Sequence, residues 1–215
     1  KYMNAEVHEI SLSQNAKVDK YHDFPKQLTR AAKLLGEQHY LYRTLQARRA
    51  YFEGFPLAYS DDYNKAKLEQ ALTYFRESVE WQPDMPLALL GVQAVYGNGL
   101  LQADSSELYT HLANAIAPSW ILPYVRMAEM FSSNFGQFDK ARQYLDLAAN
   151  IDSSSVLFLE AQGTFFFDQK RYREAEPILK KIIASSSSSV CLPCSQVMLG
   201  EILLETGRTA EATAL

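Results

Sequence analysis

The chain has 215 residues, of which 47% are hydrophobic and 21% are charged, and its formal net charge at pH 7 is −4. This length is enough for one large domain or two small ones with a substantial core. The acidic balance argues against a nucleic-acid surface, because phosphate binding requires clustered Lys and Arg. No apolar run is long enough to predict a membrane-spanning helix.

Residues 1–36 do not share the pattern of the rest of the chain. The stretch "AEVHEISLS" alternates imperfectly and is compatible with a short strand. The stretch "FPKQLTRAAKLLGEQHY" predicts a helix, because its apolar residues fall on one stripe. These residues are Leu28, Ala31, Ala32 and Leu35. We expect residues 1–36 to form an N-terminal cap, or the remnant of a neighbouring subdomain, before a domain at 37–215.

From residue 37 onward, sets of three residues spaced four and three apart recur along the chain. Such spacing places each set on one stripe of a helix. The intervals between successive sets lie close to 34–37 residues, which predicts a structural repeat. The sets are Ala71, Phe75 and Ser78; Leu108, Leu112 and Ala115; Ala141, Leu145 and Ala148; and Ala175, Leu179 and Ile182.

Each of these helices follows a first helix of different character. A small residue lies midway along several of the first helices, as at Gly163 and Gly200, and a larger side chain follows three positions later, as at Phe166 and Leu203. The small residue allows the second helix to approach closely.

We expect "EGFPLAYSDDYNK" to form an inserted loop in the first pair.

The pattern resembles the tetratricopeptide repeat over about residues 38–215. That family places a small residue at its eighth position, an aromatic residue at its eleventh, alanines near its twentieth and twenty-seventh and a proline at its thirty-second. The matching residues are Gly163, Phe166 and Ala175 in one repeat and Ala71, Ser78 and Pro83 in another. The resemblance implies an all-α fold: a right-handed superhelix of about five helix hairpins with a short N-terminal extension.

A narrower stretch, "QPDMPLALLGVQAVY", is similar to the helical module of CadC-type bacterial transmembrane one-component regulators. In that group a DNA-binding domain and a membrane segment precede an exported sensory domain. This resemblance implies a sensory or interaction role in transcription regulation, and a periplasmic or membrane-associated location.

The two cysteines, Cys191 and Cys194, form a C-x-x-C motif before an apolar helical stretch. Redox catalysis would require a βαβ context, which this chain lacks, and a zinc site would require a second pair of ligands. The four histidines are scattered at no metal-ligand spacing. The alternatives are a local disulfide in an exported protein and two thiols in a cytosolic one.

No catalytic, metal or cofactor site is predicted elsewhere. The pair Asp61 and Asp62 is interpreted as solvated loop charge, and phosphate-binding loops and nucleophile-elbow motifs are absent. The local basic clusters are interpreted as solvated helix faces. They comprise Arg43, Arg48 and Arg49, then Lys170, Arg171 and Arg173.

In the tetratricopeptide register, the first helices line a concave groove that binds a partner. The alternative is that several of these residues pack against the inserted loop or the N-terminal segment. The predicted groove residues are Leu87, Leu90, Ala94, Asn98, Leu122, Val125, Glu129, Ser132, Glu160, Thr164, Phe167, Asp168, Val197, Glu201 and Glu205.

The sequence therefore favours a non-enzymatic scaffold that binds a protein or peptide, as part of a larger bacterial regulator or envelope assembly protein. An extended or helical peptide with apolar anchors and a basic flank suits the predicted groove. The alternative function is a small-molecule receptor whose groove is closed by the inserted loop. Neither nucleic-acid binding nor membrane insertion by this chain is expected.

Overall fold

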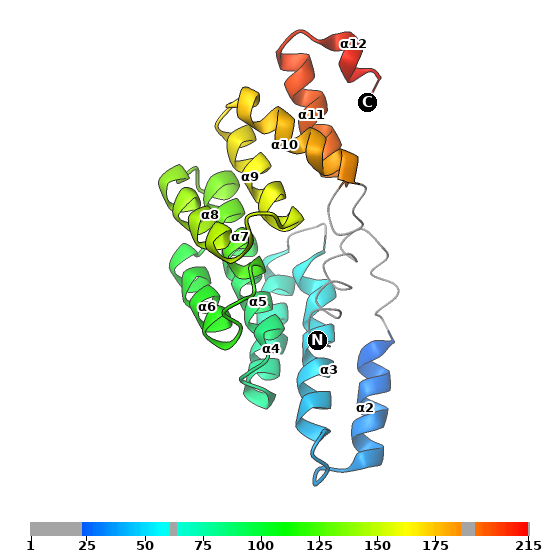
Figure 1. Cartoon of the computed structure of the whole chain (residues 1–215). Coiled ribbons are helices and arrows are strands. Elements are labelled where there is room, and N and C mark those ends of the chain that lie inside the picture. Colours follow the sequence, from blue (N-terminus) through cyan, green and yellow to red (C-terminus); the bar gives the residue numbers. More distant parts are fainter. Residues whose placement is uncertain (1–22, 61–63, 186–191, 215) are drawn as a thin grey trace. The chain divides into compact units, whose positions relative to one another are not determined.

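A computed structural model describes residues 23–60, 64–185 and 192–214, and these residues form helices without any strand (Figure 1). The described residues group into two compact units, one ending at Pro123 and the other beginning at Tyr124. The expected strand near residues 5–13, and the pair Asp61 and Asp62, lie outside the described residues.

The N-terminal unit contains one leading helix and two helix hairpins. Helix α2 packs against α3, α3 against α4, and α5 against α6. Helix α2 begins with Pro25 in its first turn and ends at Gly36, which adopts a positive φ of 74°. The elements are α2 (Phe24–Leu35), α3 (Tyr42–Ala58), α4 (Lys65–Trp81), α5 (Pro86–Ala94), η3 (Val95–Gly99) and α6 (Ala103–Ile116).

The C-terminal unit continues the same alternation of first and second helices. Helix α9 packs against both α8 and α10, and α10 packs against α11. The elements are α7 (Leu122–Glu129), which begins at the boundary between the units, η4 (Met130–Asn134), α8 (Phe138–Asp152), α9 (Val156–Asp168), α10 (Tyr172–Ser185), α11 (Leu192–Glu205) and α12 (Thr209–Ala212). The described chain is thus an all-α array of five helix hairpins preceded by α2.

The prediction of an inserted loop in the first pair was wrong for its first six residues, which are part of helix α3. The stretch "EGFPLA" belongs to the last turns of α3, which continues to Ala58, with Pro56 inside the helix. A glycine and a proline within six residues are normally loop signals. Here Gly54 suits a position inside the helix, because a Cβ at this position would lie in tight contact, at 3.1 Å, with the ring of Phe75 on α4.

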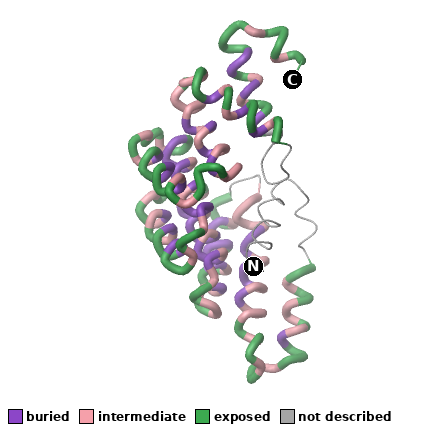
Figure 2. Tube along the Cα trace, viewed as in Figure 1, coloured by how far each residue is buried: buried purple, intermediate pink, exposed green. Residues whose placement is uncertain are grey.

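Three of the four predicted stripes are buried as expected, and their members form the inner faces of α4, α8 and α10 (Figure 2). Phe75 and Leu179 are completely buried. Within these stripes, Phe75 lies against Gly54 on α3 and Leu179 lies against Gly163 on α9, so each of these large side chains faces a glycine of the first helix of its own pair.

The predicted stripe of α6 was wrong. Leu108 and Leu112 are 56% and 43% exposed, whereas Ser106, Thr110 and Ala113 are buried. These three residues restore the period, since Ser106 follows Ala71 and precedes Ala141 by equal intervals. The prediction assumed that the apolar residues of this helix face the core. In this helix, however, the side chains that face the core are mostly polar.

Two first helices end in a π-helical segment, η3 after α5 and η4 after α7. Such a segment accommodates extra residues within a helix. The distance from the small residue of the first helix to the stripe of the second is twelve positions from Gly163 to Ala175, but thirteen from Ala128 to Ala141. The π-helical turn absorbs this extra residue without a loop.

Candidate functional site

On α5, the predicted groove residues form a partly exposed row. Leu87, Leu90 and Ala94 are half-buried and Asn98, in η3, is exposed. The opposite side of α5 is buried and includes Ala88 and other core residues. The row is therefore the side of α5 that remains accessible, and it is apolar along its first two turns.

Leu122 and Val125, on α7, are buried in the core, at 4% and 1% exposure. One turn further on, Glu129 is half-buried and its carboxylate pairs with Arg126 at 2.8 Å. At α7, only Glu129 of the predicted set therefore presents an accessible polar group.

In the C-terminal unit, the side chains of η4 and α9 meet through a carboxylate. The Asp168 Oδ2 atom accepts hydrogen bonds from the hydroxyls of Ser132, at 2.6 Å, and Ser133, at 2.7 Å. Ser132 is buried, whereas Ser133 is exposed. Two hydroxyl donors hold the carboxylate in one orientation at the end of α9, and a charge-assisted bond of this kind is stronger than a neutral one.

Helix α9 is connected to α11 by Thr164, whose Oγ1 lies 3.9 Å from the Sδ atom of Met198. Phe167 is half-buried, and its ring lies 6.1 Å from that of Tyr172 on α10. Glu160, one turn before Thr164, is also half-buried. Along one side, α9 thus offers a hydroxyl, part of an aromatic ring and the fixed carboxylate of Asp168.

Helix α11 continues this set with exposed side chains. Val197 is 61% exposed, and Glu201, one turn further along, is also exposed. Glu205, at the end of the helix, is exposed as well. Cys194 lies in the first turn of α11, while Cys191 lies outside the described residues, so the disulfide between them stays a prediction.

Two basic residues of the first cluster singled out in the sequence make contacts within the fold. Arg43 donates from its Nε to the carbonyl of Trp81 at the end of α4, at 3.1 Å. Arg49 pairs with the carboxylates of Glu53 and Glu77. These pairings agree with the interpretation of the first basic cluster as part of a helix face. In the second cluster, Lys170 and Arg171 lie in the turn between α9 and α10 and not on a helix face.

The pKa of the Glu53 carboxyl is raised above its ordinary value. Burial raises it most, Arg49 lowers it, and the neighbouring Glu77 raises it. Desolvation is the largest of these effects. The carboxyl is nevertheless engaged by Arg49, at 2.5 Å, on the same helix. We therefore interpret this cluster as an internal ion-pair network between α3 and α4, and not as an acid–base site.

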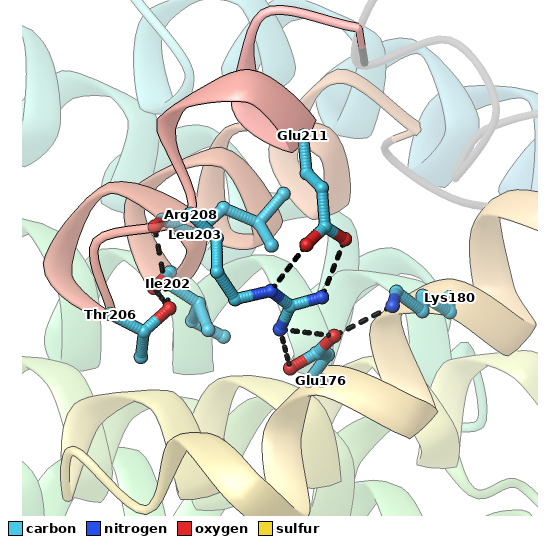
Figure 3. Close-up of polar contacts among 7 residues, drawn as sticks. All are labelled: Glu176, Lys180, Ile202, Leu203, Thr206, Arg208 and Glu211. Carbon is cyan, nitrogen blue, oxygen red and sulfur yellow. Dashed lines mark hydrogen bonds and ion pairs between the residues drawn. The ribbon is translucent and has the colours of Figure 1, made fainter.

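A second network joins α10 to the last hairpin (Figure 3). Arg208 donates to both oxygens of Glu176, at 2.8 and 2.9 Å, and to Glu211, while Lys180 also donates to Glu176. Hydrogen bonds from Lys180 and Arg208 lower the pKa of Glu176. The bidentate pairing of Arg208 Nε and Nη2 with the two oxygens of Glu211 orients the guanidinium, so this network positions the turn between α11 and α12.

Among residues 23–60, 64–185 and 192–214, no group of three His, Cys, Asp or Glu side chains is arranged to hold a metal ion. Over the same residues, no helix combines the length and the apolar character that crossing a bilayer requires.

Sequence reasoning missed two members of this site. Ser133 is the second donor to Asp168, and Met198 is the neighbour of Thr164. The repeat could have identified both residues, because Met198 follows Thr164 by one repeat length and Ser133 adjoins the predicted Ser132. The spacing that identified the helices also identifies which side chains of successive first helices are neighbours.

No protein-family model matches the chain, and no curated protein sequence matches it. Its structure is similar to the crystal structure, at 2.39 Å resolution, of a tetratricopeptide repeat protein from Parabacteroides merdae ATCC 43184. The TM-score is 0.60 at 15% sequence identity, and the match covers 94% of this chain and 77% of that chain. The likeness shows the fold: this chain has an all-α helical-repeat fold similar to that of a tetratricopeptide repeat protein.

Helical-repeat proteins of this kind are commonly interaction scaffolds, whose stacked hairpins present extended binding surfaces. The fold does not by itself define an activity. The similarity to CadC-type regulators stays a prediction from the sequence.

Proposed function

We propose that the chain is a non-enzymatic scaffold that binds a peptide segment of a partner protein through the first helices of its C-terminal unit. The observation that carries this proposal is the Asp168 carboxylate, held by two serine hydroxyls beside the half-buried ring of Phe167. A carboxylate whose position is already fixed loses little conformational entropy when it binds a cation.

The chemistry of the neighbouring side chains defines the peptide. Phe167 and Val197 supply apolar surface on α9 and α11, and Glu201 adds a second exposed carboxylate. A segment that places an apolar residue next to Lys or Arg matches this set. The accessible row Leu87, Leu90 and Ala94 of α5 supplies a further apolar contact surface within the N-terminal unit.

In the cell, we propose that this module is the interaction or sensory part of a larger bacterial regulator or envelope assembly protein. This assignment rests on the sequence similarity of "QPDMPLALLGVQAVY" to the CadC-type module. The first part of the proposal, peptide binding, does not depend on it.

Selection from a random displayed peptide library tests the proposal. We expect the wild-type chain to enrich peptides that combine an apolar residue with an adjacent Lys or Arg. Asp168→Asn keeps the shape of the side chain and its serine contacts but removes the charge. It should weaken the binding of these peptides about tenfold. Leu147→Ser, at an exposed leucine of α8, is the matched control and should leave binding unchanged.

Failure to enrich any shared pattern would contradict the proposal. So would peptides that bind Asp168→Asn as tightly as the wild type, because the carboxylate would then lie outside the binding face.

A further inference from the structure

The faces of helix α6 are reversed relative to the usual amphipathic helix. Ser106, Thr110 and Asn114 are at most 6% exposed, whereas Leu108 and Leu112 are 56% and 43% exposed. Ile116 completes the outer row at 39% exposure. We call Leu108, Leu112 and Ile116 the α6 stripe; their spacing of four residues makes a continuous apolar strip about 12 Å long.

The polar inner face is incompletely satisfied. The Ser106 hydroxyl donates to the carbonyl of Gln93 on α5, at 3.1 Å, and Asn114 donates to the carbonyl of Thr110. The side-chain oxygens of Asn114 and Gln93, however, are buried without a hydrogen-bond partner. Burying such atoms is unfavourable, so burial alone does not explain why the leucines of α6 point outward.

A contact surface on the outer side of α6 does explain it. Soluble proteins keep contiguous exposed apolar patches small unless the patches meet a partner. An amphipathic helix with apolar residues three or four positions apart is the element that packs on such a strip. The α6 stripe has the length of slightly more than two helical turns, which two or three side chains of such a helix would cover.

The charge carried by α6 itself selects among possible partners. No Lys or Arg occurs between Arg76 and Arg126. Within α6 itself, the acidic residues are Asp104 and Glu107. Asp104 is exposed one turn before Leu108, at the beginning of the stripe. A second copy of the chain would bring the same stretch without cations, whereas a basic helix is complementary to it.

We propose that the α6 stripe is a docking surface for a basic amphipathic helix of a partner protein, with Lys or Arg at the end that meets Asp104. The stripe lies on a second helix of the N-terminal unit. It does not use any residue of the peptide site proposed above on α9 and α11, and the two proposals can fail independently.

The probe is a synthetic eighteen-residue helical peptide with leucines at positions i, i+4, i+8 and i+11 and lysines elsewhere on its polar face. Its binding to the whole chain is measured by fluorescence anisotropy at low and high salt. We expect Leu112→Ser to weaken binding at least about tenfold. Leu147→Ser, whose leucine is 41% exposed on α8, is the matched control and should have no effect.

Charge is tested separately. A probe with glutamates in place of the lysines should bind far more weakly, and Asp104→Asn should reduce the salt dependence of the lysine probe. The proposal is overturned if Leu147→Ser weakens binding of the lysine probe as much as Leu112→Ser does. It is also overturned if the glutamate probe binds as tightly as the lysine probe. The absence of any binding would also overturn it.

Two further outcomes are decisive. If the wild-type chain sediments as a dimer and Leu112→Ser as a monomer, the occupant of the stripe is a second copy and not a basic helix. If Leu112→Ser unfolds, as seen by circular dichroism, Leu112 belongs to the core and the stripe is not a docking surface.

Discussion

The ring of Phe75 on α4 lies against Gly91 on α5, so closely that a Cβ added to Gly91 would be 2.8 Å from two ring atoms. A Cβ added to Gly54 on α3 would be 3.1 Å from the same atoms. Phe75 is completely buried. One aromatic ring therefore fills the space between two successive first helices, and both of these helices have a glycine where they contact it.

Gly91→Ala should destabilise the protein. The new methyl group would overlap a ring that is packed on all sides, and overpacking of this kind typically costs about 1–3 kcal/mol. Gly200→Ala is the matched control, because a Cβ at Gly200 has no heavy atom within 4 Å. It should stabilise α11 by roughly 0.5–1 kcal/mol through helix propensity. Urea unfolding of both variants measures the difference, and equal effects would contradict the packing described here.

Gly163→Leu tests the same relationship in the C-terminal unit. A Cβ at Gly163 would lie 3.3 Å from a methyl group of Leu179, which is completely buried. We expect a loss of at least about 1–3 kcal/mol. An unchanged thermal transition would show that α9 and α10 are not packed in this register.

Two buried polar residues should respond in opposite directions. Ser78→Ala removes a hydrogen bond of 2.7 Å to the Ala47 carbonyl on α3, and it should cost about 0.5–1.5 kcal/mol. Asn114→Leu removes an unpartnered buried oxygen and adds apolar contact, and it should raise the free energy of unfolding by about 1 kcal/mol. Chemical denaturation compares both with wild type, and destabilisation by Asn114→Leu would contradict this expectation.

Stability should depend on Glu176 in a specific pH range. Hydrogen bonds from Lys180 and Arg208 lower the pKa of Glu176 below its ordinary value of 4.5. Its stabilising contribution is therefore present above about pH 4.5 and is lost as the pH falls through the lowered value. Glu176→Gln should cost about 1 kcal/mol at pH 7, and the difference from wild type should shrink as acid protonates the Glu176 carboxyl. A difference that stays constant even where the protein is fully protonated would contradict this.

Much of the repeat could be predicted from spacing alone, because in α4, α8 and α10 the residues that face the core are small or apolar. In α6, Ser106 and Thr110 occupy the equivalent positions, and a pattern based on hydrophobicity selects the outward leucines instead. In α3, Gly54 and Pro56 indicated a loop, because only the position of Phe75 shows that a glycine fits closely inside that helix.

The candidate site could be predicted only in part. The spacing located α9 and α11 and selected Thr164, Phe167 and Asp168. The bonds from Ser132 and Ser133 to Asp168 depend on how η4 turns at the end of α7. A π-helical turn changes which side chains face α9, and periodicity based on 3.6 residues per turn does not contain this information.

The most direct test of peptide binding is a titration of the isotope-labelled chain with a selected peptide, followed by backbone amide chemical shifts. We predict that the largest changes occur at Thr164, Phe167 and Asp168 on α9 and at Val197 on α11, and that the exposed faces of α8 and α10 remain unchanged. Changes confined to α8 and α10, or none at saturating peptide, would contradict the proposed binding face.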